Sequence, residues 1–211
     1  MSHQSFSLET KGGDRQNVDA CTAPYLPCTT RRRIASMDEI EVDGVLRDLR
    51  HLRSFVVTLP GKGKDGADLR VRISLGLHTI SQGCDRGSHH LEDENGKPRR
   101  FCEDRYAFSL GLPELSKRMI EQNYFCWDSI DRNRAMNYAV IDIAPGRVRE
   151  LTDGEHQVVF FYLYPCRQPE ADVNLIITSC YVRKVLFSHV KRRYNMHTLL
   201  RTCLYKGKRL P

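Results

Sequence analysis

The chain has 211 residues, of which 40% are hydrophobic, and it carries a formal net charge of +7. Its apolar content is too high for a wholly disordered chain and is sufficient for the core of one domain. No apolar run approaches the roughly 18 residues that cross a bilayer, and the N-terminus lacks the apolar stretch of a signal peptide. We therefore expect a cytoplasmic protein with no membrane partner, whose eight cysteines are mostly thiols.

The positive charge is concentrated at the C-terminal end. Residues 173–211 contain nine Lys or Arg residues and no Asp or Glu, which leaves a net charge of −2 for residues 1–172. A surface of one sign attracts polyanions and is the usual electrostatic footprint of nucleic-acid binding.

The N-terminal quarter predicts a polar arm followed by a helix. Residues 1–35 are polar, and we expect them to be mostly disordered. Ser36–Glu39 has the pattern of a capping box, which marks a helix start. Hydrophobic residues then follow at helical spacing, namely Val42, Val45, Leu46, Leu49 and Leu52.

Two strands and a long loop are predicted next. Residues 54–59 and 68–77 have the composition and alternation of strands, and the glycine-rich stretch 60–66 predicts a hairpin between them. That stretch spells G-x-G-x-x-G, but a dinucleotide site needs a helix after it, so we reject such a site. Residues 78–104 show no periodicity, and we expect a long loop there.

The centre of the chain predicts a short strand and a helix. Tyr106, Phe108 and Leu110 alternate as in a strand, and Pro113 is well placed in the first turn of a helix over 113–122. Residues around Ser109 approximate the G-x-S-x-G nucleophile elbow, but the first glycine is missing. We therefore expect Ser109 to be a solvent-facing strand residue and not a nucleophile.

The C-terminal part predicts the main sheet. Residues 137–144, 158–164 and 173–182 predict three strands of an antiparallel meander. A basic and partly helical segment, 183–211, ends the chain. The expected fold class is α+β, with one domain over 36–211 in which helices pack on one side of an antiparallel sheet.

Histidines and cysteines in the predicted loop form a candidate metal site. Zn²⁺ prefers four nitrogen or sulfur ligands, which His78, Cys84, His89 and Cys102, with His90 adjacent, could supply. Their spacing matches no standard zinc motif, and solvated histidines beside ordinary thiols are the simpler interpretation. We therefore expect no cofactor and keep zinc as the alternative.

Basic and aromatic residues gather at two places that could bind nucleic acid. Arg99, Arg100 and Arg105 bracket Phe101 and Tyr106, and such side chains can bind phosphates and stack on bases. The alternative is a solvated loop anchored by Phe101. At the C-terminal end, the candidate phosphate ligands are Lys184, Lys191 and Arg201.

The same C-terminal segment supports two further hypotheses. In a metal-independent ribonuclease, His189 or Tyr194 would transfer the proton, and the cations would stabilise the phosphate; these are Arg183, Arg192 and Arg193. In an interaction protein, the basic end would dock an acidic partner protein. We favour nucleic-acid binding, for which the sequence does not distinguish RNA from DNA.

The strand–strand–basic-end layout of residues 137–205 resembles RelE/ParE-type toxin folds. The resemblance implies a small antiparallel sheet with Arg, Lys and Tyr at the site, and it covers about a third of the chain. The central block from Arg99 to Leu115 also looks like blocks in uncharacterised bacterial proteins, a likeness that implies no activity.

Overall fold

The computed structural model describes six segments of the chain: residues 38–84, 90–93, 95–130, 136–141, 153–186 and 192–210. The predicted N-terminal arm, residues 1–35, lies outside them. The described residues combine strands and helices in an α+β fold, as predicted. In this part of the chain, no helix is long and apolar enough to cross a membrane.

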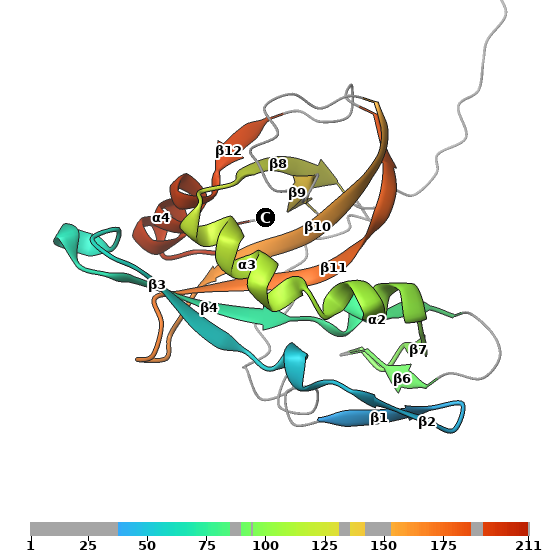
Figure 1. Cartoon of the computed structure of the whole chain (residues 1–211). Coiled ribbons are helices and arrows are strands. Elements are labelled where there is room, and N and C mark those ends of the chain that lie inside the picture. Colours follow the sequence, from blue (N-terminus) through green and yellow to red (C-terminus); the bar gives the residue numbers. More distant parts are fainter. Residues whose placement is uncertain are drawn as a thin grey trace, which may run out of the picture.

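A seven-stranded sheet is the centre of the fold (Figure 1). Its strands, in spatial order, are β12 (Arg193–Asn195), β8 (Phe125–Ile130), β9 (Met136–Ile141), β10 (Gly154–Pro165), β11 (Val173–Val185), β4 (Leu69–Leu75) and β3 (Phe55–Leu59). The strands expected at 54–59, 68–77, 158–164 and 173–182 are confirmed, as is the one at 137–144 as far as residue 141, and β9, β10 and β11 form the expected meander. The sheet is mixed and not purely antiparallel, because β4 pairs with β11 in parallel.

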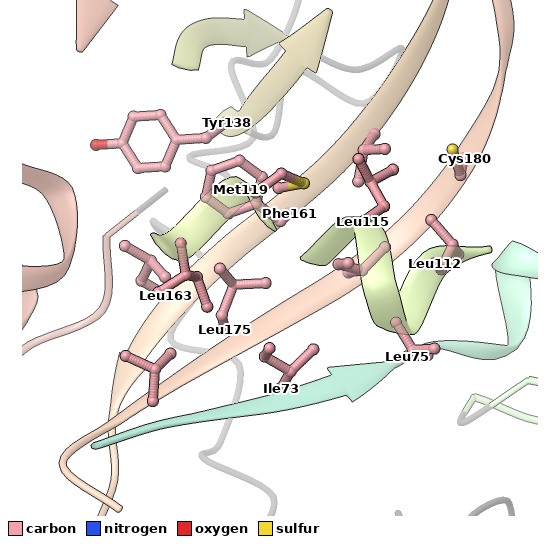
Figure 2. Packing of buried hydrophobic residues seen from close by; sticks show 14 of the residues in the cluster. Ile73, Leu75, Leu112, Leu115, Met119, Tyr138, Phe161, Leu163, Leu175 and Cys180 are labelled. Atoms are coloured by element: carbon pink, nitrogen blue, oxygen red, sulfur yellow. The ribbon is translucent and has the colours of Figure 1, made fainter. Parts of the chain in front are cut away.

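Among the described residues, three helices lie on one face of this sheet, here called the inner face. They are α2 (Glu103–Ser109), α3 (Leu112–Glu121) and α4 (Met196–Lys206). Helix α3 is confirmed close to its predicted bounds, and its Leu115, Met119 and Ile120 are buried. Figure 2 shows Leu115 and Met119 of α3 above Phe161, Leu163 and Leu175 of the sheet.

The predicted helix after residue 36 is wrong. The described part of that segment forms a hairpin of β1 (Glu39–Val42) and β2 (Val45–Asp48), followed by one 3₁₀ turn, η1 (Arg50–Leu52). Asp43 and Gly44 form its turn with φ of 50° and 77°, values that a two-residue hairpin turn requires and a helix forbids.

The predicted short strand at 106–110 is also wrong, because these residues end α2 and enter the turn before α3. Glu103 and Asp104 occupy the first turn of α2, where negative charge favours a helix. Ser109 is fully buried and does not face solvent.

Residues 78–104 are not simply a loop. The turn η3 (Leu77–Thr79) leads into a second, three-stranded sheet. Its strands are β5 (Ser81–Gly83), β6 (Leu91–Glu92) and β7 (Pro98–Phe101). The hairpin between β3 and β4 has the expected turn, with a 3₁₀ turn η2 (Lys64–Gly66) at its tip.

The basic C-terminal segment is partly helical, as predicted. Leu199, Leu200 and Cys203 of α4 are buried against the inner face, whereas Leu186, before the helix, is exposed. The six cysteines in the described ranges are thiols, and burial raises the pKa of Cys126, Cys180 and Cys203.

Candidate nucleic-acid interface

The face of the seven-stranded sheet opposite the helices, here called the outer face, combines arginines with aromatic rings. Successive side chains of a strand point to opposite faces, so the residues between the inner-face residues belong here. They include Arg70 and Arg72 of β4, Tyr181 and Arg183 of β11, Val158, Phe160, Tyr162 and Tyr164 of β10, Phe125 and Trp127 of β8, and Arg193 of β12.

The outer face lacks acidic residues in its described strands. Asp128, Glu155 and Lys184 alternate with outer-face residues and therefore belong to the inner side of the sheet. The strands thus carry four arginines and no Asp or Glu on this face, among the side chains that are described. The result is a positive field over a surface of rings.

One group of contacts joins two cations through two neighbouring aromatic rings. Phe160 and Tyr181 lie on neighbouring strands with their ring centroids 5.4 Å apart. The Arg105 guanidinium lies 4.8 Å from the Tyr181 centroid, and Arg183 lies 5.8 Å from that of Phe160. Both distances are within the range of cation–π attraction.

A second group lies farther along β10. The rings of Tyr162 and Tyr164 are 5.0 Å apart at 82°, and the Arg209 guanidinium lies 4.9 Å from the first centroid and 5.3 Å from the second. The backbone amides of Leu210 and Leu163 each donate a hydrogen bond to the carbonyl of the other residue, and Leu210 is buried in the inner core. Arg209, one residue earlier, is therefore directed to the outer face.

A third group lies at the β12 edge. Arg193 pairs with Trp127 in the strand register, and its guanidinium lies 4.5 Å from the Phe125 ring. Phe125 and Trp127 are in edge-to-face contact at 6.4 Å. The outer face is thus flanked by arginines at β12, at β11 and beyond the end of α4.

Not every ring of this face is accessible. Phe160 is 7% exposed and Trp127 is 5% exposed, so both serve mainly as packing for their neighbours. Phe125, Tyr162, Tyr164 and Tyr181 are only partly buried. These four rings are the ones that a ligand can reach.

The sequence did not indicate Arg70 and Arg72 as binding residues, because they lie in the part of the chain with net negative charge. Arg70 pairs with Asp172 at 3.2 Å. Arg72 donates hydrogen bonds to Gln168 and to Ser54 Oγ, both neutral groups. The alternation L-R-V-R-I in β4 already placed both arginines on one face, but only the parallel pairing with β11 joins that face to the aromatic rings.

The other predicted phosphate ligands do not share this face. Lys184 lies on the inner side of β11, and Arg201 lies on α4 with its guanidinium 5.9 Å from the Tyr205 ring. Arg100 and Arg192 are exposed elsewhere. Lys191 lies outside the described residues.

The arginines of the small sheet have mainly structural contacts. Arg99 is 7% exposed and donates from Nε to Ser81 Oγ at 2.8 Å and from Nη2 to the Ser81 carbonyl at 3.0 Å. Arg105 donates from Nη1 to the same carbonyl at 2.6 Å and to that of His78 at 3.0 Å. Arg105 therefore connects the small sheet to Tyr181 on the outer face.

The residues of the ribonuclease hypothesis are spread over two faces. Tyr194 donates from its hydroxyl to Asp128 Oδ2 at 3.3 Å and packs against Tyr138, on the inner side. Burial raises the pKa of Tyr138 to about 12, with Asp128 and Tyr194 contributing. Arg183 and Arg193 face the opposite way, and His189 lies outside the described residues.

The histidine and cysteine residues of the zinc hypothesis are not gathered in the described part. The amide of Cys84 bonds to the Pro98 carbonyl and that of Cys102 to the Ile80 carbonyl, so the two cysteines flank opposite ends of the β5–β7 pairing. His78 Nε2 lies 3.8 Å from Asp93 Oδ2. No group of three potential ligands occurs among the described residues; His89 lies outside them, and the zinc prediction stays untested.

Ser109 has a histidine neighbour but is not arranged as a nucleophile. Its Oγ lies 2.7 Å from His51 Nε2 and donates its hydrogen to the Tyr106 carbonyl, also at 2.7 Å. Because the serine is fully buried, the pair joins the η1 turn to α2. Burial lowers the pKa of His51, although Asp48 acts in the opposite direction.

The chain was compared with known proteins. No curated protein matches it, and no solved structure matches it. A family model matches residues 39–204, which extend from the first strand of the hairpin almost to the end of α4. The match covers most of the chain, and the protein therefore belongs to the YjaZ family.

Proposed function

We propose that the protein binds nucleic acid through the outer face of its seven-stranded sheet. The observation that supports this proposal is the set of arginines that lie over aromatic rings on this face. Arg183, Arg193 and Arg209 come from the acid-free C-terminal segment, and each guanidinium lies within 6 Å of an aromatic centroid on this face.

An arginine that lies over a ring remains able to bind phosphate. The N–H donors of a guanidinium lie in its own plane, whereas a ring contacts the face of that plane. Contact with a ring also restricts the arginine side chain, which reduces the conformational entropy lost when the guanidinium binds a phosphate. The rings therefore prepare the arginines for phosphate binding and do not compete with it.

The distribution of the C-terminal cations provides a matched test. Arg183, Arg193 and Arg209 contact the outer-face rings. Lys184, Arg201 and Lys206 belong to the same segment and are exposed, but lie on the inner side of β11 or on α4. Replacing either trio by glutamine removes the same formal charge. Any difference between the two variants then reports position and not net charge.

The experiment is a salt titration of binding to labelled RNA and DNA. Each phosphate contact contributes about −0.9 on duplex DNA, or about −0.7 on single strands, to the slope of log affinity against log salt. The outer-face triple variant should flatten the slope by about 2 to 3. The control triple variant should change it by less than about 1.

Two outcomes would contradict this proposal. Equal loss of affinity and slope in both variants would show that bulk charge, and not the outer face, attracts the polyanion. Absence of binding by the parent protein at low salt would reject nucleic acid as the partner and would favour the docking of an acidic protein.

A further inference from the structure

We infer that the outer face takes single-stranded nucleic acid and stacks one base at the paired rings of Tyr162 and Tyr164, beside Arg209. This inference rests on the proposed function and names its ligand class. Its evidence is the geometry of the three side chains, which come from one strand and from the end of the chain.

The perpendicular arrangement of the two rings limits what can bind there. Tyr162 and Tyr164 are partly exposed and lie at 82° to each other. A flat base can therefore stack on only one ring at a time, with the other ring beside its edge. Arg209 lies over both rings and is exposed, so its donors are placed for the phosphate of the stacked nucleotide.

A duplex does not fit this surface well. The major groove admits a helix or a two-stranded ribbon, whereas this face belongs to a sheet of seven strands. A duplex would present mainly phosphates to such a face, since its bases are already paired and stacked. The four accessible rings would then have no base to contact, while a single strand offers a π-face at every base.

The charge pattern agrees with a single strand that crosses the sheet. Arg209 and Arg183 flank the aromatic residues of β10 from two directions, and Arg72 lies two strands from Tyr164, because both pair with Asn174. Phosphates on either side of the stacked base can therefore find a cation. The outer-face strands carry no carboxylate among their described side chains, although Asp172, just before β11, places one beside Arg70.

The first test uses the parent protein alone and compares three ligands of equal length at one salt concentration: a single strand, the corresponding duplex, and a strand whose sugars lack bases. Stacking is worth about 1–3 kcal/mol per base, which corresponds to about 5- to 150-fold in affinity. We expect the single strand to bind more tightly than the base-free strand by about this factor, and more tightly than the duplex.

The second test uses matched variants. Tyr164→Leu should weaken single-strand binding by about 5- to 150-fold, and Tyr164→Phe should retain it because the ring remains. Tyr205→Leu is the control, since Tyr205 also has an arginine over its ring but lies on α4. Thermal unfolding of each variant verifies that it is folded.

The outcomes separate the two proposals. Equal affinity of the parent for the single strand and the base-free strand would overturn base stacking while leaving nucleic-acid binding intact. Tyr164→Leu with parental affinity for the single strand would overturn the assigned position. Failure of the parent to bind any of the three ligands would instead reject the proposed function itself.

Discussion

The two faces of strands β10 and β11 differ in the kinds of side chain that they carry. On the inner face, Phe161, Leu163, Leu175 and Ile177 have no solvent exposure, and they pack beneath the helices (Figure 2). On the outer face, Tyr162, Tyr164 and Tyr181 are partly exposed and Arg183 is exposed, whereas Val158, Phe160 and Val185 form a second buried cluster. Around Tyr162 and Tyr164, β10 thus alternates between core and surface, and a register shift by one residue would exchange the two there.

The comparison implies that stability and binding can be altered separately. Inner-face residues contribute through removal of apolar surface from water. Arg183, Arg193 and Arg209 are exposed, and their contacts with rings contribute only about 0.5–1 kcal/mol each at such sites. Substitutions on the inner face should therefore unfold the protein, whereas those on the outer face should reduce its affinity.

The largest expected effect is the loss of an inner-face aromatic ring. Phe161→Ala should lower the free energy of unfolding by about 3–5 kcal/mol, because the ring is fully buried. Tyr164→Ala, three positions along the same strand, should cost about 1 kcal/mol. Urea denaturation measures both. Equal losses of unfolding free energy in the two variants would show that Tyr164 is as much a core residue as Phe161, and would contradict the difference between the two faces.

A smaller effect is expected from the hairpin that supports the inner core. Ile40 and Val42 of β1 are buried in the inner core, and the turn holds Gly44 at a φ of 77°. Gly44→Ala should cost about 1–2 kcal/mol, because a side chain is strained in this conformation. Binding of nucleic acid should not change.

The sign of this result also tests the correction of the predicted helix. In a helix, the same substitution would stabilise the protein by about 1 kcal/mol, so a higher melting temperature for Gly44→Ala would contradict the hairpin. Gly83→Ala in β5 is the control, since Gly83 has no positive φ and its added methyl group meets nothing within 4 Å.

The smallest expected effect is on the pH dependence of stability. Burial depresses the pKa of His51 below its usual 6.5 in the folded state. The unfolded chain therefore binds more protons between the folded pKa and 6.5, and stability should fall as pH decreases through this window. Thermal unfolding of His51→Gln should show a shallower decrease. Identical pH profiles of stability for the parent and the variant would show that His51 does not contribute to the pH dependence.

The outer face should not share this pH dependence. Its exposed cations are guanidinium groups, which stay protonated at all physiological pH values, and His156, which lies opposite Arg183 on this face, is 7% exposed. Affinity for a single strand should therefore be nearly constant between about pH 6 and about pH 8, provided that the protein remains folded. A large change in affinity over this range would indicate that a histidine belongs to the binding site.

Five of the seven strands of the main sheet could be predicted because their signals are local, whereas β8 and β12 were not predicted. Alternation in 68–77 and 173–182 identified β4 and β11, and Pro113 identified the start of α3. The hairpin at Asp43–Gly44 was also readable, since Asp-Gly between two apolar stretches favours a two-residue turn. The capping-box pattern at 36–39 and the helical spacing of the apolar residues after it predicted a helix instead.

The candidate interface could be predicted only in part. The acid-free C-terminal segment correctly indicated where the positive charge lies. The parallel pairing of β4 with β11, which adds Arg70 and Arg72 to the face, joins residues about a hundred positions apart and has no local signal. The pairing of Leu210 with Leu163, which places Arg209 over two tyrosines, has no local sequence signal either.

Photo-cross-linking of a bound single strand, followed by mass spectrometry of the peptides, tests the central claim most directly. We expect cross-links on β10 and β11, at Tyr162, Tyr164 or Tyr181. We expect none on α4 at Tyr205, although this tyrosine is 55% exposed and also has an arginine over its ring. Cross-links concentrated at Tyr205, with the outer-face tyrosines unmodified, would contradict the account.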